Sequence, residues 1–274
     1  MKLYRLLDER SQVTYAVFDG QGYRRVQGDP CHNWQSTQEL VKPSRVLPPI
    51  APPQIFAIGL NYRAHAAETN KPLPDAPVVF AKAVTSVIGP DDVIVLPAAG
   101  PDCVDYEVEL AVIIGRTARN VPAGKALEHV LGYTVANDVS ARDWQQRLGQ
   151  WVRAKSFDTF CPIGPCIETQ LDPSDLRLTT SVNGQVMQDS RTSDMVFNVP
   201  QLIEFLSADL TLLPGTLILT GTPSGVGVAR KPPVFLRAGD KITCSVEGIG
   251  ELTNMVSAAA NASLWEEPKS TWGT

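Results

Sequence analysis

The alternation of apolar and polar residues along the chain predicts a strand-rich α+β fold built from short elements. The clearest strand covers Val104–Gly115, where valine, tyrosine and leucine alternate with acidic residues. The same pattern predicts further strands at Ile55–Leu60, Val78–Lys82, Gly132–Asn137, Thr216–Thr220 and Lys241–Val246. Two short stretches favour helices, Lys125–Leu131 and Val199–Leu206, and the second has a proline near its start.

The first 48 residues are expected to form a small N-terminal β domain with its linker. Residues 1–27 contain three short alternating runs separated by Gly20 and Gly22, which is typical of an antiparallel meander. Residues 42–54 are rich in proline and indicate a linker. The catalytic domain is therefore predicted at residues 49–274, with a loose tail after about Leu264.

Composition and charge exclude several classes of partner. Of the 274 residues, 43% are apolar and 19% are charged, as in ordinary soluble proteins, and the net charge is −5. Without a run of lysine or arginine, nucleic acid is not an expected partner. Membrane insertion is not expected either, because no segment approaches the roughly 18 apolar residues that span a bilayer. The amino-terminal segment resembles no secretory signal, which predicts a cytoplasmic protein, with the mitochondrial matrix left open.

The acidic residues of the clearest strand suggest a metal site. Because side chains alternate in a strand, Asp105, Glu107 and Glu109 share one face, with neighbours about 7 Å apart. Carboxylates held this close repel each other, and a hard divalent cation removes that repulsion. The alternative is an edge strand whose polar face is simply exposed to water.

A fourth carboxylate, Asp138, stands where an apolar strand meets an expected helix. Ser140 and Asp143 have the spacing of a capping box, which predicts that a helix starts there. Asp138 would then project from a rigid strand end. The alternative is that it forms an Asx turn or caps the helix itself.

Three further features are candidates for chemistry. If residues 61–68 are helical, His65 and Glu68 lie on one face, and a glutamate beside an imidazole makes a general base; otherwise they are an exposed pair. The polar residues 61–76 around them are a candidate lid. Lys155 would hold a carboxylate or stabilise an enolate near a metal, although lysines are usually solvated. The glycine-rich segment Thr220–Gly227 lets the backbone approach a ligand, or is only a tight turn.

Taken in order, these motifs resemble the fumarylacetoacetate hydrolase family over nearly all of residues 54–260. The motifs are N-Y-x-x-H-x-x-E at Asn61–Glu68, D-Y-E-x-E at Asp105–Glu109, N-D-x-S-A-R-D at Asn137–Asp143, A-K-S-F-D at Ala154–Asp158, S-x-N-G at Ser181–Gly184 and T-G-T-P-x-G-V-G at Thr220–Gly227. The resemblance implies a mixed β-roll that assembles as a homodimer. It also implies a divalent ion, Mg²⁺ or Mn²⁺ and in some cases Ca²⁺, bound by Glu107, Glu109 and Asp138.

The resemblance also implies roles for the other candidates. His65 and Glu68 would activate water, and Lys155 would contact oxygens of the substrate or of the metal site. Residues Gln145, Thr222 and Arg63 are expected to contact a small 2-oxo acid substrate. The strand argument leaves Asp105 as a carboxylate that supports the metal ligands from behind.

One departure from the family pattern narrows the expected activity. Fumarylacetoacetate hydrolases proper carry a fourth metal carboxylate before the catalytic histidine, and nothing in Gly59–Tyr62 supplies one. The chain therefore resembles the shorter acylpyruvase, decarboxylase and isomerase branch. Cleavage of a C–C bond in a 2,4-dioxo acid, through a metal-stabilised enolate, ranks first. Oxaloacetate decarboxylation or keto–enol tautomerisation ranks second and is favoured by the insertion Arg230–Pro233, and a non-catalytic oxo-acid binder ranks third.

Overall fold

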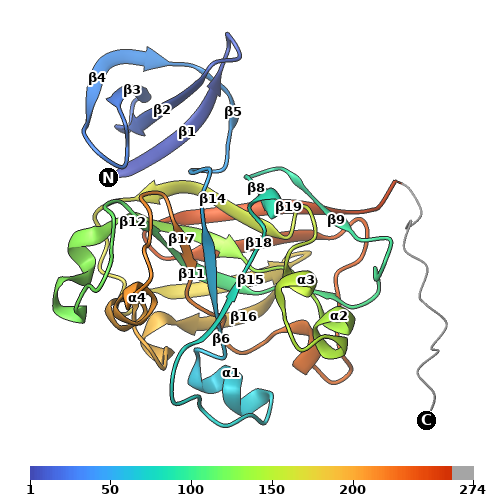
Figure 1. The fold of residues 1–274 in the computed structure, drawn as a ribbon. Helices are drawn as coiled ribbons and strands as arrows, with labels where there is room; N and C mark the ends of the chain where they lie inside the picture. The colour runs from blue at the N-terminus through green and yellow to red at the C-terminus, as the bar shows by residue number, and fades with distance from the viewer. Residues whose placement is uncertain (261–274) are drawn as a thin grey trace.

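A large mixed sheet runs through the whole molecule and carries the acidic motifs near its centre. The computed structural model describes residues 1–260, so the expected tail after Leu264 lies outside the described residues. Its first five strands form the small lobe at the top of Figure 1, drawn in blue. These strands are β1 (Lys2–Asp8), β2 (Val13–Phe18), β3 (Tyr23–Gly28), β4 (Trp34–Val41) and β5 (Pro43–Val46). Strand β5 pairs with β1, so the prediction of a plain linker from residue 42 was wrong over Pro43–Val46.

The N-terminal strands join the central sheet through β1. The strand order is β4-β3-β2-β1-β14-β12-β11-β17-β6-β7, with β5 and β8 attached at β1 and β14. The added members are β6 (Ile55–Gly59), β7 (Val78–Ala81), β8 (Val87–Ile88), β11 (Val108–Ile114), β12 (Val130–Asn137), β14 (Cys161–Glu168) and β17 (Leu217–Leu219). Strand β11 lies between β12 and β17 with all seven residues buried.

A second sheet packs against one face of β11. Its order is β16-β15-β18-β19-β9, and its strands are β9 (Val93–Leu96), β15 (Arg177–Val182), β16 (Gln185–Arg191), β18 (Lys241–Val246) and β19 (Gly250–Ala258). Val108 and Leu110 belong to the core shared with this sheet, whereas Ala111 and Ile113 belong to the core on the opposite face. Glu109 therefore shares its face with Ala111 and Ile113, away from the second sheet.

The predicted strand Val104–Gly115 is interrupted. Its first part, β10 (Val104–Asp105), leaves the large sheet and pairs with β13 (Ser140–Ala141), while β11 begins only at Val108. This break leaves Tyr106 and Glu107 between two strands. Asp105 is thereby turned toward the segment that follows β12, rather than lying in one row with the two glutamates.

The helices are short and lie at separate places around the sheets, with two of them side by side (Figure 1). They are α1 (Arg63–Glu68), α2 (Arg142–Arg147), α3 (Val152–Lys155) and α4 (Val199–Ser207), with 3-10 turns at η1 (Val84–Ser86), η2 (Ala123–His129), η3 (Thr192–Asp194) and η4 (Gly227–Ala229). The predicted helix at Lys125–Leu131 was wrong in type and extent, because η2 ends at His129 and β12 begins at the next residue. Among residues 1–260, no helix is long and apolar enough to cross a membrane.

The predicted helix start after Asp138 is correct, but the predicted capping box was wrong. Helix α2 follows Ala141 and has no side-chain cap. The Ser140 hydroxyl donates instead to the Asp138 carbonyl at 2.9 Å, because Ser140 lies in the extended pairing of β13 with β10. A capping box does form at α4, between Asn198 and Gln201.

Candidate active site

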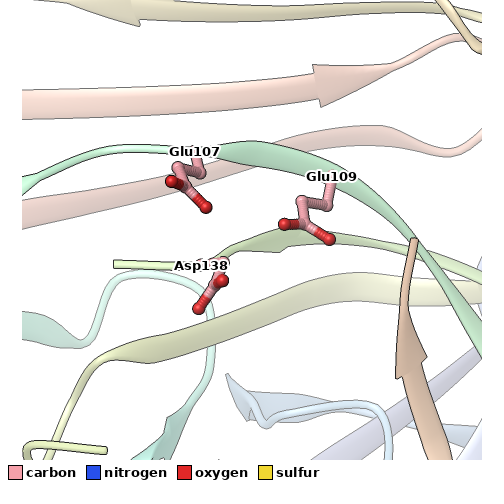
Figure 2. Close-up of side chains that lie close together, drawn as sticks. All are labelled: Glu107, Glu109 and Asp138. Atoms are coloured by element: carbon pink, nitrogen blue, oxygen red, sulfur yellow. The ribbon is translucent and has the colours of Figure 1, made fainter. Parts of the chain in front are cut away.

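The strand register brings three carboxylates together. Glu107 and Glu109 are two residues apart, and the pairing of Val108 with Asn137 places Asp138 beside them. The Asp138 amide donates to the Glu107 carbonyl at 2.8 Å. One oxygen from each side chain lies within 4.8 Å of the others, and all three residues are buried. Figure 2 shows the three carboxylates lying close together, with both glutamates on one segment of the chain and Asp138 on the next.

Buried cations surround these carboxylates. The Lys155 ammonium bridges Glu107 Oε2 at 2.7 Å and Asp138 Oδ2 at 2.6 Å. The Arg142 guanidinium donates to Glu107 Oε1 at 2.6 Å and to Asp105 Oδ2 at 2.9 Å. Burial raises the pKa of Glu107, but Lys155 and Arg142 outweigh it and hold that pKa well below its usual range. Burial, with Asp138 and Glu107 nearby, instead raises the pKa of Glu109 well above its usual range.

Besides Arg142, sequence reasoning missed a second member of this cluster, Lys82. Its side chain is fully buried, and its ammonium donates to Asp138 Oδ1 at 2.5 Å and to the backbone carbonyl of Lys155. Lys82 closes the segment Val78–Lys82, which was predicted only as a strand. The pairing of β7 with β6 turns the strand end toward Asp138, and no local pattern carries that information.

The proposed general base is assembled as its spacing suggested. Helix α1 places His65 Nδ1 2.7 Å from Glu68 Oε1, so the second ring nitrogen, Nε2, is left for the cavity that His65 lines. The other Glu68 oxygen accepts the Gly225 amide at 2.8 Å. The glutamate is therefore held from both sides, and the alternative of a free exposed pair does not apply.

The glycine-rich segment serves the acidic residues of the site. Besides the bond from Gly225 to Glu68, the amide of Gly221 donates to Glu109 Oε2 at 2.6 Å and that of Gly227 to Asp105 Oδ1 at 2.7 Å. Gly225 has φ +101°, and a Cβ there would lie 2.2 Å from the Met187 carbonyl oxygen. The expected close backbone approach therefore occurs, and in this structure it is directed at three carboxylates.

A cavity of about 300 Å³ opens beside the acidic cluster. Its wall includes Ile58, Gly59, Leu60, His65, Thr69, Lys71, Phe80, Glu107, Arg142, Gln145, Gln146, Trp151, Lys155, Thr222 and Val228. The Trp151 ring covers Gly59, where an added Cβ would meet the ring at 2.4 Å. This volume suits a small acid. The wall combines a residue expected to hold the metal (Glu107), the expected base (His65) and two expected substrate contacts (Gln145 and Thr222).

The structure brings most of the expected site residues together. Gln145 lines the cavity, and its Oε1 accepts from Arg142 at 2.9 Å, which leaves the amide nitrogen as a donor. The hydroxyl of Thr222, also in the wall, donates to the Val108 carbonyl and accepts from Gln188. Arg63 lies outside the wall and donates to the carbonyls of Asp194 and Met195.

The alternatives left open for the acidic residues are wrong. An exposed edge strand is excluded, because Glu107 is 5% exposed and Glu109 1%, and β11 is internal to its sheet. Asp138 does not act as a side-chain cap, because its carboxylate faces two lysines. Asp105 lies behind Arg142 and accepts amides of the glycine-rich segment.

The donor set fits a hard divalent cation. Three buried carboxylates converge from β11 and from the residues next to β11 and β12. Carboxylate oxygens are the ligands that Mg²⁺, Mn²⁺ and Ca²⁺ prefer. The Lys155 ammonium already lies between two of them at hydrogen-bond distance, so positive charge is favourable at this point. The site thus fits the metal that the sequence motifs imply.

Comparison with known proteins identifies the family. Residues 54–257 match the model of the fumarylacetoacetate (FAA) hydrolase C-terminal domain. The chain belongs to this family. The predicted family is confirmed by this match, and the predicted strand-rich fold is confirmed by the solved relatives described below. The protein is an enzyme rather than the non-catalytic binder considered above.

Curated and solved relatives fall within the same branch. The chain is 49% identical over 214 residues to the oxaloacetate tautomerase FAHD2A, mitochondrial, of Bos taurus, covering 76% of this chain and 68% of the relative. It is 46% identical to the solved 5-carboxymethyl-2-hydroxymuconate delta-isomerase of Mycobacterium smegmatis, with TM-score 0.85, covering 94% of this chain and 100% of the other. A 2-hydroxyhepta-2,4-diene-1,7-dioate isomerase of Mycobacterium marinum is 42% identical, with TM-score 0.83, covering 95% and 100%.

Proposed function

We propose that this protein is a divalent-metal-dependent keto–enol tautomerase of oxaloacetate or a close 2-oxo acid analogue. The observation that carries the proposal is that His65, held by Glu68, lines the same small cavity as Glu107 of the carboxylate cluster. The names of the relatives support it, because one is an oxaloacetate tautomerase and two are isomerases, and keto–enol tautomerisation is itself an isomerisation. The reaction needs one base and a means to stabilise an enolate.

Glu107, Glu109 and Asp138 would hold the ion, which supplies Lewis-acid polarisation of the 2-oxo group when bound. His65 Nε2 would take a proton from the carbon next to the 2-oxo group and deliver it to the 2-oxo oxygen, which gives the enol. Glu68 keeps the imidazole oriented through Nδ1, and Gly225 keeps Glu68 in place. The Gln145 amide nitrogen and Lys155 are the donors that would orient the substrate oxygens.

Hydrolysis of a 2,4-dioxo acid is the second candidate. It ranked first from the sequence, and the same His65–Glu68 pair would then activate water for attack on the distal carbonyl. We rank it second because the relatives described above are named a tautomerase and two isomerases, whereas a solved relative at 37% identity is named a fumarylacetoacetate hydrolase.

The bovine and human relatives named FAHD2A are also called mitochondrial. This agrees with the alternative of a mitochondrial matrix protein and gives no support to the expectation of a cytoplasmic one. A homodimer remains a prediction from the family resemblance, to be checked by mass in solution.

The test is a pair of assays on one preparation. Loss of oxaloacetate enol absorbance and cleavage of acetylpyruvate are followed with Mg²⁺ or Mn²⁺, each with an EDTA control. We expect metal-dependent tautomerisation that falls about 10²- to 10⁴-fold in His65→Gln, the usual contribution of a general base. His129→Gln is the matched control. That imidazole bonds to the backbone carbonyls of Arg116 and Thr117 and does not line the cavity. Tautomerisation that persists in EDTA, or in His65→Gln, would refute the proposal; cleavage of acetylpyruvate alone would move the assignment to the hydrolase.

A further inference from the structure

The cavity wall contains a cation that the cluster does not use. Three positively charged side chains line the cavity, those of Lys71, Arg142 and Lys155. Arg142 and Lys155 are both buried and tied to carboxylates at 2.6–2.9 Å. Lys71 is exposed, and within residues 1–260 its ammonium makes no ion pair or hydrogen bond.

The position of Lys71 is nevertheless fixed relative to the base. Helix α1 ends at Glu68, Asn70 turns the chain with φ +53°, and the Lys71 amide donates to the Ala66 carbonyl at 2.9 Å. The backbone of Lys71 is therefore anchored to the helix that carries His65. Only the flexible side chain needs to order when it meets a ligand.

Formal charges show what this lysine adds. The connected cluster holds four carboxylates and three cations, namely Asp105, Glu107, Glu109, Asp138, Lys82, Arg142 and Lys155. The cluster alone is one charge negative, and a divalent ion makes it one charge positive. That single positive charge matches one substrate carboxylate. A second carboxylate in the same cavity needs another cation, and Lys71 is the one available in the wall.

We propose that Lys71 binds the distal carboxylate of the substrate and makes the site selective for 2-oxo dicarboxylic acids over acids with a neutral tail. The inference rests on the proposed function for the placement of the 2-oxo acid end. It concerns substrate choice, because Lys71 does not belong to the carboxylate cluster or to the His65–Glu68 pair.

Two stable chelating ligands separate selectivity from turnover. N-oxalylglycine and N-ethyloxamate share the oxo-acid end and differ in having a carboxylate or a methyl group at the tail. Titration of each into Mn²⁺-loaded protein should show N-oxalylglycine binding about five-fold more tightly, as for one partly exposed charge pair. Lys71→Gln should abolish this preference, whereas Lys71→Arg should keep it. Lys125→Gln, which removes an exposed lysine from η2, should leave it unchanged.

The outcomes distinguish this inference from the proposed function. Equal affinity for the two ligands in the unmodified protein, or an unchanged preference in Lys71→Gln, would overturn the role of Lys71 while leaving tautomerisation intact. A preference that depends on Lys71 in a protein without tautomerase activity would support the subsite and refute the function. Failure to bind either ligand would overturn both, since neither chelates without the metal site.

Discussion

At the scale of single residues, the site depends on carboxylates and cations that compensate one another out of water. Burying an ion pair gives little net stability, but removing one partner leaves an uncompensated charge that costs about 3–5 kcal/mol. Lys82 should show this effect, because its fully buried ammonium neutralises one oxygen of Asp138. The other Asp138 oxygen faces Lys155.

Lys82→Met should therefore destabilise the metal-free protein by about 3–5 kcal/mol. Because a divalent ion would replace part of the missing positive charge, Mn²⁺ should raise the melting temperature of this variant more than that of the unmodified protein. Calorimetric melting in EDTA and in Mn²⁺ measures both effects. Lys125→Met is the control for an exposed lysine. An unchanged melting temperature in EDTA would show that Lys82 does not compensate Asp138.

At this scale, the sequence predicted residue types better than partners. The spacing of His65 and Glu68 gave their contact only as one of two alternatives, which the family resemblance favoured, and the structure forms it within one turn of helix. Lys82 and Arg142 were missed as partners of Asp138 and Glu107, because those contacts join segments 56 and 35 residues apart in the chain. Such contacts depend on sheet order, which local patterns do not carry.

At the scale of elements, the glycine-rich segment links the base to the metal cluster. Its amides donate to Glu68, Glu109 and Asp105, which come from α1, β11 and β10. One segment thus positions the base relative to the carboxylates. This arrangement explains why glycine is needed at positions 221 and 225, where φ is positive and a side chain would strain the backbone.

Gly225→Ala should reduce activity at least about ten-fold and destabilise the fold by about 1–3 kcal/mol, the usual cost of a strained backbone position. The added Cβ would meet the Met187 carbonyl at 2.2 Å, so the segment must shift and the bond to Glu68 lengthen. Turnover and melting temperature are measured beside Gly124→Ala, whose Cβ meets nothing within 4 Å. Full activity in Gly225→Ala would mean that this bond does not position the base.

Elements were predicted well where they are regular and poorly where tertiary pairing shapes them. The strands β6, β7, β12, β17 and β18 and helix α4 lie where the patterns placed them, within a few residues. The break between β10 and β11 was not predicted, since the residues alternate without interruption through Tyr106 and Glu107. Strands β15 and β16 were missed, although the Asn183–Gly184 turn between them, with φ of 51° and 81°, is a typical hairpin signal.

At the scale of the whole molecule, the acidic cluster lies where the large sheet, its two-stranded branch and the adjacent short helices meet. Glu109 comes from β11 in the large sheet, Glu107 from the break just before β11, Asp138 from the residue after β12, and Lys155 from α3. An ion held there would join these parts. Its binding energy adds to the free energy of unfolding, by about 2.7 kcal/mol at a concentration a hundred times the dissociation constant.

Metal removal should therefore lower the melting temperature of the whole molecule by several degrees, on the scale of roughly 2–4 °C per kcal/mol for a chain of this size class.

The stabilisation by the metal should depend on pH in a definite direction. Burial, with Asp138 and Glu107 nearby, raises the pKa of Glu109, so a proton competes with the ion for this carboxylate. Competition strengthens as the pH falls, and the stabilisation by Mn²⁺ should be larger at pH 8 than at pH 6. Glu109→Gln removes the titrating group and should show a small Mn²⁺ effect at both values. A stabilisation by Mn²⁺ that is the same at both pH values in the unmodified protein, or the same in Glu109→Gln, would contradict metal binding by Glu109.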